Sequence, residues 1–157
     1  RKLGDHLSKC SKKWYFKRKI NILYVLMINP INAIEWNIWG ASRRDTLRYL
    51  NKLCRDNAIR LLVLLEPMSE SSQLEVVRRM LHCDSTQVFL EEKIWVLWFS
   101  KYSITYTELA EQMVHLRILF QSGLVIYFSA IYAKCTRVGR CALWQAMKEL
   151  AVAQQGP

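Results

Sequence analysis

The chain has 157 residues, which is enough for one globular domain and too few for two ordinary ones. Its 52% hydrophobic content excludes a disordered chain, and its formal net charge of +10 is concentrated at the start, where residues 1–19 hold eight Lys and Arg against one Asp. Such a basic segment binds phosphates without specificity or is a solvated tail, and we favour the tail. We therefore divide the chain into a basic arm with a short apolar leader, residues 1–30, and a folded region, residues 31–157.

Cysteine and histidine spacing bears on metal sites and on the compartment. Five cysteines are spread along the chain without a Cys-x-x-Cys pair, and three histidines lie far apart. This pattern argues against a disulfide framework and a structural zinc site, and the thiols favour a reducing compartment, nuclear or cytoplasmic. The apolar run at residues 20–28 is about half as long as a membrane-spanning helix, so we expect no membrane association. Because the chain begins with Arg1 and Met27 precedes the best-organised region, we expect a fragment or a translated leader before a later start.

The first half of the folded region alternates strands and helices. Residues 31–38 predict a buried strand, and residues 42–57 a helix that Ser42 can cap, with its apolar side chains at helical spacing and a basic outer face. Residues 59–65 form a continuous apolar run, typical of a strand covered on both faces, and Glu66-Pro67 ends it. Ser69 or Ser71 then caps a second predicted helix that runs to about residue 82.

The second half predicts strands in succession and a last helix. Alternating polar and apolar residues favour antiparallel strands with one wet face at residues 86–90, 93–99, 102–108, 112–120 and 124–133. The last helix covers about residues 137–153, with Leu143, Met147 and Leu150 on one stripe. The predicted fold class is therefore α/β with a mixed sheet.

Two polar residues lie where predicted strands end. Asn37 ends the first strand, and Glu66 ends the strongly apolar second one. If these strands are parallel neighbours, both side chains emerge at the same edge of the sheet, where open α/β sheets hold their sites. An amide and a carboxylate together suit a hard cation and phosphate oxygens. The alternative is a turn residue and a solvated glutamate, and spacing alone favours that alternative.

Four ordered motifs resemble a known family. Ala33-Ile34-Glu35-Trp36-Asn37-Ile38-Trp39-Gly40 resembles the opening strand of endonuclease/exonuclease/phosphatase domains, in the Trp-Asn-Ile-Arg-Gly form of plant non-LTR retrotransposons. Leu64-Leu65-Glu66-Pro67 is similar to the family's second motif, and Lys93-Ile94-Trp95-Val96-Leu97-Trp98 to the tryptophan-rich strand of the plant elements. Ile131-Tyr132-Ala133-Lys134-Cys135-Thr136-Arg137, followed by Arg140, Leu143 and Trp144, resembles their tyrosine motif and the helix after it.

The resemblance implies a four-layer α-β-β-α sandwich that hydrolyses phosphodiesters with Mg²⁺, with DNA as the ancestral substrate. By that resemblance, Glu66 ligates Mg²⁺ and Asn37 orients the metal or the phosphate. Tyr132 hydrogen-bonds the scissile phosphate, and Arg140 supports a neighbouring phosphate. For Tyr132 the alternative is a tyrosine packed at a sheet edge, and for Arg140 a solvated helix residue.

The chain also departs from the family pattern. Trp39 replaces the usual Arg, and the 157 residues contain neither the Gly-Asp-x-Asn motif nor the Ser-Asp-His motif that supply the residues activating water. We therefore expect an incomplete sandwich, truncated before these motifs, that does not turn over. The rival hypotheses are a nucleic-acid-binding remnant that uses the basic arm and the cations of the first helix, and a translated relic without selected function. Those helix cations are Arg43, Arg44, Arg48, Lys52 and Arg55.

Overall fold

A computed structural model describes residues 11–14, 23–28, 31–41, 43–99 and 102–154. The chain separates into two compact units, the first ending at Ser100 and the second beginning at Lys101. The structure confirms the α/β class, with two sheets and, in the described ranges, three α-helices. No helix among the described residues is long and apolar enough to cross a membrane.

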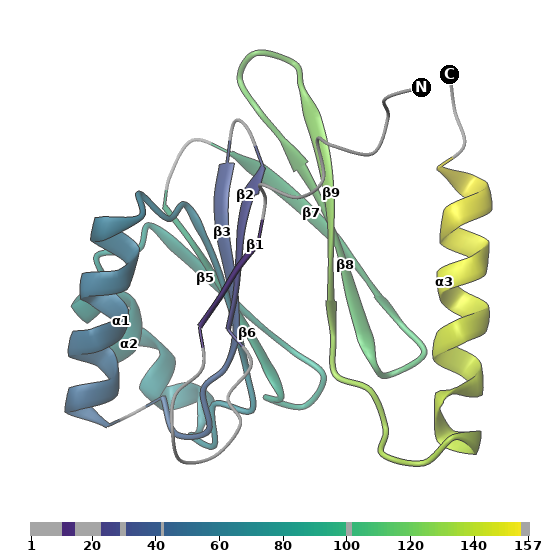
Figure 1. The fold of residues 1–157 in the computed structure, drawn as a ribbon, viewed down its shortest axis with the longest axis horizontal. Coiled ribbons are helices and arrows are strands. Elements are labelled where there is room, and N and C mark those ends of the chain that lie inside the picture. Colours follow the sequence, from purple (N-terminus) through teal and green to yellow (C-terminus); the bar gives the residue numbers. More distant parts are fainter. Residues whose placement is uncertain (1–10, 15–22, 29–30, 42, 100–101, 155–157) are drawn as a thin grey trace. The chain divides into compact units, whose positions relative to one another are not determined.

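The first unit is built on a mixed six-stranded sheet in the order β1-β2-β3-β4-β6-β5 (Figure 1). Its parallel pair is β3–β4, in which Asn37 lies opposite Leu65, and its other neighbours are antiparallel. The strands are β1 (Ser11–Trp14), β2 (Leu23–Ile28), β3 (Ile31–Asn37), β4 (Leu61–Leu65), β5 (Ser85–Phe89) and β6 (Ile94–Trp98). Part of the predicted basic arm is thus strand β1, which pairs with β2 and so is not a solvated tail there, and part of the leader is strand β2; residues 20–22 lie outside the described part.

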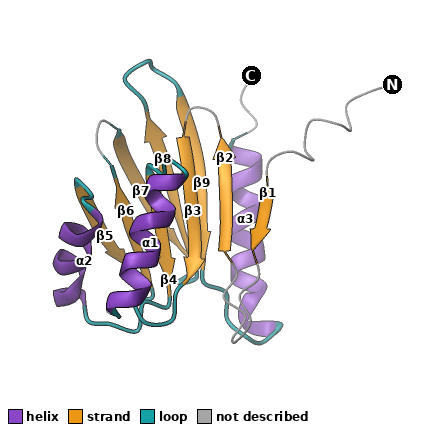
Figure 2. Cartoon of the chain, turned by 60° about the vertical axis from the view of Figure 1, so that its left-hand side comes forward, coloured by secondary structure: helices purple, strands orange, loops and turns teal. Residues whose placement is uncertain are grey.

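Two helices cover one face of this sheet (Figure 2). Helix α1 (Arg44–Asp56) connects β3 to β4, and a short 3-10 turn, η1 (Ser71–Gln73), leads into α2 (Leu74–Leu81). The core beneath them joins apolar side chains of both helices to one face of β3, β4 and β6, and includes Leu50, Leu62 and Trp95, all fully buried. Burial of this continuous apolar surface is the main source of stability for the unit.

The predicted helix caps are wrong where they can be tested. Residue Arg43, not Ser42, occupies the N-cap position of α1 and makes no side-chain capping bond, while Ser42 lies outside the described residues. Neither Ser69 nor Ser71 caps α2, because η1 intervenes, and the Ser69 hydroxyl donates instead to the carbonyl oxygen of Pro67 at 3.2 Å. Serine at a helix start has competing local partners, so its presence alone does not fix a cap.

The prediction that each of these strands has one solvent-exposed face is also wrong for β6. Its residues Ile94, Trp95, Val96 and Leu97 are all fully buried. Trp95 and Leu97 pack into the core beneath α1 and α2, and Ile94 and Val96, on the opposite face of the strand, are buried as well.

The second unit is an antiparallel three-stranded sheet with a C-terminal helix. Strands β7 (Ser103–Leu109), β8 (Met113–Leu119) and β9 (Val125–Ile131) pair in sequence order. A second 3-10 turn, η2 (Val138–Arg140), leads into α3 (Cys141–Ala153), which lies along the sheet (Figure 1). The predicted stripe of α3 is confirmed in part, since Leu143 is buried and Met147 and Leu150 are half-buried.

Candidate functional site

The structure brings Asn37 and Glu66 together at the carboxyl edge of the parallel pair. Asn37 ends β3, Glu66 follows β4, and the Asn37 Nδ2 donates a hydrogen bond to the Glu66 Oε2 at 2.9 Å. Both residues are half-buried. Parallel pairing of the two strands brings the ends that carry this amide and this carboxylate to the same edge of the sheet, as the sequence predicts.

Backbone hydrogen bonds hold the two strand ends in this arrangement. The amide of Ile38 donates to the Leu65 carbonyl at 3.0 Å, and the amide of Ala41 donates to the Pro67 carbonyl at 2.8 Å. The amide of Glu66 itself donates to the Lys93 carbonyl at 2.9 Å, which ties the residue to the turn between β5 and β6. The side chains of the pair thus project from a backbone that is anchored on two sides.

The backbone of Glu66 is in an unfavourable conformation. Its φ is 50°, in the left-handed region that non-glycine residues seldom adopt, and Trp39 in the facing loop has a φ of 36°. Each such residue costs about 1–2 kcal/mol, and such residues gather at functional sites, where their neighbours hold them in place. Eight other non-glycine residues among those described also have a positive φ, including Leu90, Glu91 and Glu92 in the turn between β5 and β6, so the conformation of Glu66 by itself marks a tight turn after β4.

The oxygen atoms of this pair that accept no hydrogen bond determine what the pair can bind. Because the Asn37 amide nitrogen donates to Oε2, Asn37 Oδ1 and Glu66 Oε1 remain as acceptors without another hydrogen bond among the described residues. Oxygen ligands of this kind fit Mg²⁺, which is commonly held by one or two carboxylates and keeps several waters. Among the described residues no three His, Cys, Asp or Glu side chains gather into a larger metal-binding group. The donor set therefore fits a weakly held, hydrated hard cation and does not form a closed protein cage.

Further carboxylates occur on the neighbouring turn between β5 and β6, but they have other partners. The Glu92 Oε1 accepts a hydrogen bond from the Ser71 amide at 3.0 Å. Hydrogen bonds from the side chain and the backbone of Ser71 lower the pKa of Glu92. The Glu91 carboxylate forms an ion pair with Lys93 at 3.3 Å. Glu66 is therefore the carboxylate of this edge that is oriented toward Asn37.

Tyr132 and Arg140 lie in the second unit, at the two ends of the loop between β9 and α3. The Tyr132 amide donates to the Gln112 carbonyl at 2.7 Å, and the residue is half-buried. The Arg140 Nη1 donates to the carbonyls of Lys134 at 3.1 Å and Cys135 at 2.9 Å. Arg140 thus holds its own loop together, which is a structural role that the sequence does not predict.

Gln112 organises this loop and was not singled out from the sequence. It is the buried polar residue among those described. Its Nε2 donates to the carbonyls of Gly139 at 3.0 Å and Ala110 at 3.3 Å, and its Oε1 accepts from the Lys134 amide at 2.8 Å. Both N–H donors and the carbonyl oxygen of the side chain are engaged, so Gln112 connects the start of β8 to the segment that carries Tyr132 and Arg140. No spacing or motif marks it, because its burial is created by the fold.

The histidines of the described part have structural partners. His82 takes a left-handed conformation at the end of α2. The His115 Nδ1 lies 2.8 Å from the Ser129 Oγ and its Nε2 lies 2.6 Å from the Gln154 Nε2, while its ring stacks on Tyr127. Burial lowers the pKa of His115. Neither residue belongs to the Asn37–Glu66 pair, and His6 lies outside the described residues.

Comparison with known proteins adds no relative. The chain matches no model of a known protein family and no curated protein.

Proposed function

We propose that this chain carries the metal-binding end of a magnesium-dependent phosphodiester hydrolase site, built on an incomplete α-β-β-α sandwich of the endonuclease/exonuclease/phosphatase type. The observation that carries the proposal is the 2.9 Å hydrogen bond between Asn37 and Glu66 at the carboxyl ends of two parallel strands. The ordered motifs of the sequence support the retrotransposon endonuclease family and DNA as the ancestral substrate. Both lines of support meet at the same two residues, since Asn37 and Glu66 belong to the first two motifs and also form the hydrogen-bonded pair.

The roles follow from the atoms that each residue offers. Glu66 supplies a negatively charged oxygen to the cation, and Asn37 holds the carboxylate in place through its Nδ2 while presenting Oδ1. When bound, Mg²⁺ supplies charge stabilisation to a phosphoryl oxygen. Tyr132 and Arg140 are proposed phosphate contacts on the motif resemblance alone.

We expect binding without turnover from these 157 residues. A phosphodiester hydrolase needs a group that activates water, and the Asn37–Glu66 pair contains no histidine or second carboxylate for this task. The Gly-Asp-x-Asn and Ser-Asp-His motifs that would supply it are absent from the sequence.

Titration with Mn²⁺, followed by its electron paramagnetic resonance signal, tests the metal site directly. The wild-type chain should bind one Mn²⁺ that Mg²⁺ displaces, and Glu66→Gln should abolish this binding. Glu91→Gln is the matched control, because it removes a carboxylate from a turn at the same sheet edge without touching the pair. Equal Mn²⁺ binding by the wild type and Glu66→Gln would show that the proposed site is wrong.

Nicking of supercoiled plasmid DNA in the presence of Mg²⁺ tests the catalytic part separately. We expect no nicking from a folded sample. Metal-dependent nicking that Glu66→Ala abolishes would instead show a working nuclease and would mean that another residue of the chain activates water.

A further inference from the structure

The outer surface of α1 carries a row of cationic side chains along one side of the helix. Four of them, Arg44, Arg48, Lys52 and Arg55, are separated by four, four and three residues, which places them within about 80° around the helix axis. We name this set the α1 basic stripe. At a rise of about 1.5 Å per residue, it extends over about 16 Å.

The charges of the stripe are accessible to a partner. All four residues are exposed, and the side chains of Arg48 and Lys52 are 75% and 68% exposed. Two acids lie beside the stripe, with Asp45 at 3.6 Å from Arg48 and Asp56 at 2.6 Å from Lys52. Arg44 and Arg55 form no ion pair with any residue that the structure describes, so the stripe keeps an excess of positive charge.

The stability of α1 does not account for this arrangement. Cations near the N-terminus of a helix oppose its dipole, yet Arg43 occupies the N-cap and Arg44 begins the helix, and the N-cap makes no side-chain bond. Exposed ion pairs such as those of Arg48 and Lys52 add little. Only Arg55, in the last turn, is placed favourably for the dipole. Residues that break a local rule without a structural gain are the ones to examine for function.

The stripe begins seven residues after Asn37 in the chain. The loop that follows Asn37 leads through Gly40 directly to Arg43, and the Arg43 guanidinium lies close to Gly40, with its Nε 3.6 Å from the place of a Cβ there. Helix α1 lies on the outside of the sheet (Figure 2). A polyanion on the stripe would therefore lie on the helix that follows the strand carrying Asn37.

The chemistry of the stripe favours the backbone of duplex DNA over a single strand. Single strands are held by aromatic side chains on which bases stack, and the stripe contains none. Tyr49, the aromatic residue of α1, is 37% exposed, but its ring packs edge-on against Trp36 at 5.9 Å. A duplex carries one phosphate per strand for about every 3.4 Å of its axis, so a stripe of about 16 Å meets several phosphates without a match to sequence.

We propose that the α1 basic stripe is a docking surface for the phosphate backbone of duplex DNA. The inference rests on the proposed function for the choice of DNA as partner, but the binding itself needs no metal. It assigns to α1 a positioning role that the four family motifs do not cover.

Fluorescence anisotropy with a labelled duplex of about 20 base pairs in EDTA, measured at several salt concentrations, tests this surface. The variant with Arg44, Arg48, Lys52 and Arg55 all changed to Gln should reduce the slope of log Kd against log salt by about 3 to 4, about one for each lost phosphate contact. The basic N-terminal arm is present in every variant, so its contribution cancels in the comparison.

A matched control removes the same number of exposed cations elsewhere. The control changes Arg79, Arg117, Lys134 and Lys148 to Gln. A second variant, Arg44→Lys with Arg48→Lys and Arg55→Lys, keeps the charges and should keep the slope. Similar slopes for the stripe variant and the control, or no duplex binding by the wild type, would overturn the inference.

The duplex-binding experiment and the Mn²⁺ titration can fail independently of each other. Loss of Mn²⁺ binding in Glu66→Gln with an unchanged slope for the stripe variant would leave the metal site standing and remove the docking surface. A reduced slope for the stripe variant, with Mn²⁺ binding absent from the wild type, would support the docking surface and remove the metal site.

Discussion

The Asn37–Glu66 pair and the Gln112 side chain are two polar arrangements that differ in what they leave unused. Gln112 is fully buried, and its amide nitrogen and its amide oxygen are both hydrogen-bonded to backbone groups of its own unit. The Asn37–Glu66 pair is half-buried, shares one hydrogen bond, and retains an amide and a carboxylate oxygen. A polar group with every partner supplied by the protein stabilises a fold, whereas acceptors left over at an anchored sheet edge are available to a ligand.

Replacement of Gln112 should give the largest effect on stability. We expect Gln112→Leu to lower the free energy of unfolding by about 2–4 kcal/mol, because it leaves the Gly139 and Ala110 carbonyls and the Lys134 amide without their side-chain partner. Urea unfolding followed by circular dichroism measures this change. The control is Gln121→Leu, which alters an exposed glutamine in the turn between β8 and β9. A loss in Gln112→Leu as small as that of the control would show that the Gln112 contacts contribute nothing.

Replacement of Asn37 should have a smaller effect on stability and a larger one on ligand binding. Asn37→Ala removes one half-buried hydrogen bond, which we expect to cost about 1 kcal/mol. Because Glu66 then loses the partner that orients it, Mn²⁺ affinity should fall, although less than in Glu66→Gln. If Asn37→Ala destabilised the chain as strongly as Gln112→Leu and left Mn²⁺ affinity intact, the contrast between the two regions would be reversed.

The two buried thiols predict that the free energy of unfolding falls at alkaline pH. Burial raises the pKa of both Cys54 and Cys83 from 9.0 to about 12. In the unfolded chain these thiols ionise near pH 9, whereas the folded chain keeps them neutral, so stability is intact below pH 9 and falls as the pH rises toward 12. Cys54→Ala with Cys83→Ala should flatten this fall in urea unfolding between about pH 8 and pH 11, even though the variant is less stable throughout.

Thiol labelling provides the control for that prediction. Cys135 and Cys141 are exposed and should react with a thiol reagent in the folded chain at about pH 8, while Cys54 and Cys83 should react only on unfolding. Fast labelling of Cys54 and Cys83 in a folded sample would contradict their burial and remove the basis for the alkaline shift.

The sequence predicts the strands and the proximity of Asn37 and Glu66 better than it predicts the polar connections. Apolar runs end at polar residues, so the pattern places β3 and β4 within about two residues, and their parallel pairing brings Asn37 to Glu66. The partners of Gln112 lie 2 to 27 residues away, and no local pattern encodes a contact that depends on how the loop after β9 returns to β8. The serine caps fail for a related reason, since the turn that intervenes before α2 is fixed by tertiary contacts such as Glu92 with Ser71.

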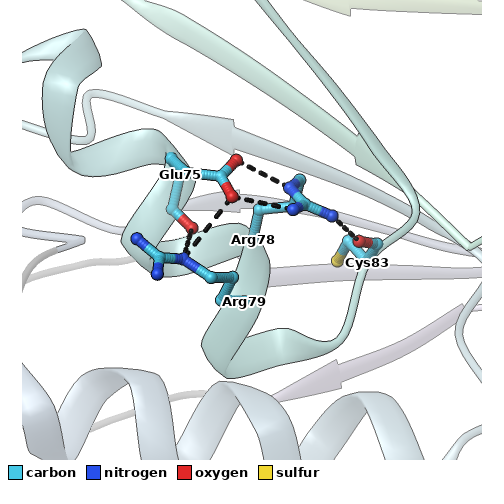
Figure 3. Close-up of polar contacts among 4 residues, drawn as sticks. All are labelled: Glu75, Arg78, Arg79 and Cys83. Carbon is cyan, nitrogen blue, oxygen red and sulfur yellow. Dashed lines mark hydrogen bonds and ion pairs between the residues drawn. The ribbon is translucent and has the colours of Figure 1, made fainter.

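The last prediction concerns Glu75 on the surface of α2, where the smallest effect is expected. The Glu75 carboxylate accepts two hydrogen bonds from Arg78 at 2.7 Å and lies 3.5 Å from Arg79, and Arg78 also donates to the Cys83 carbonyl at 3.0 Å (Figure 3). The hydrogen bonds from Arg78 lower the pKa of Glu75 from its ordinary value of 4.5. A lowered pKa in the folded state contributes stability above about pH 4.5 and loses it as the pH falls through the folded value. Glu75→Gln should therefore be slightly less stable than the wild type at about pH 7 and equal to it at low pH, as measured by thermal unfolding across that range.

Because the Glu75 carboxylate is exposed, salt should reduce the difference in stability between Glu75→Gln and the wild type at neutral pH. A difference that grew with salt or persisted at low pH would mean that Glu75 acts through packing and not through its charge.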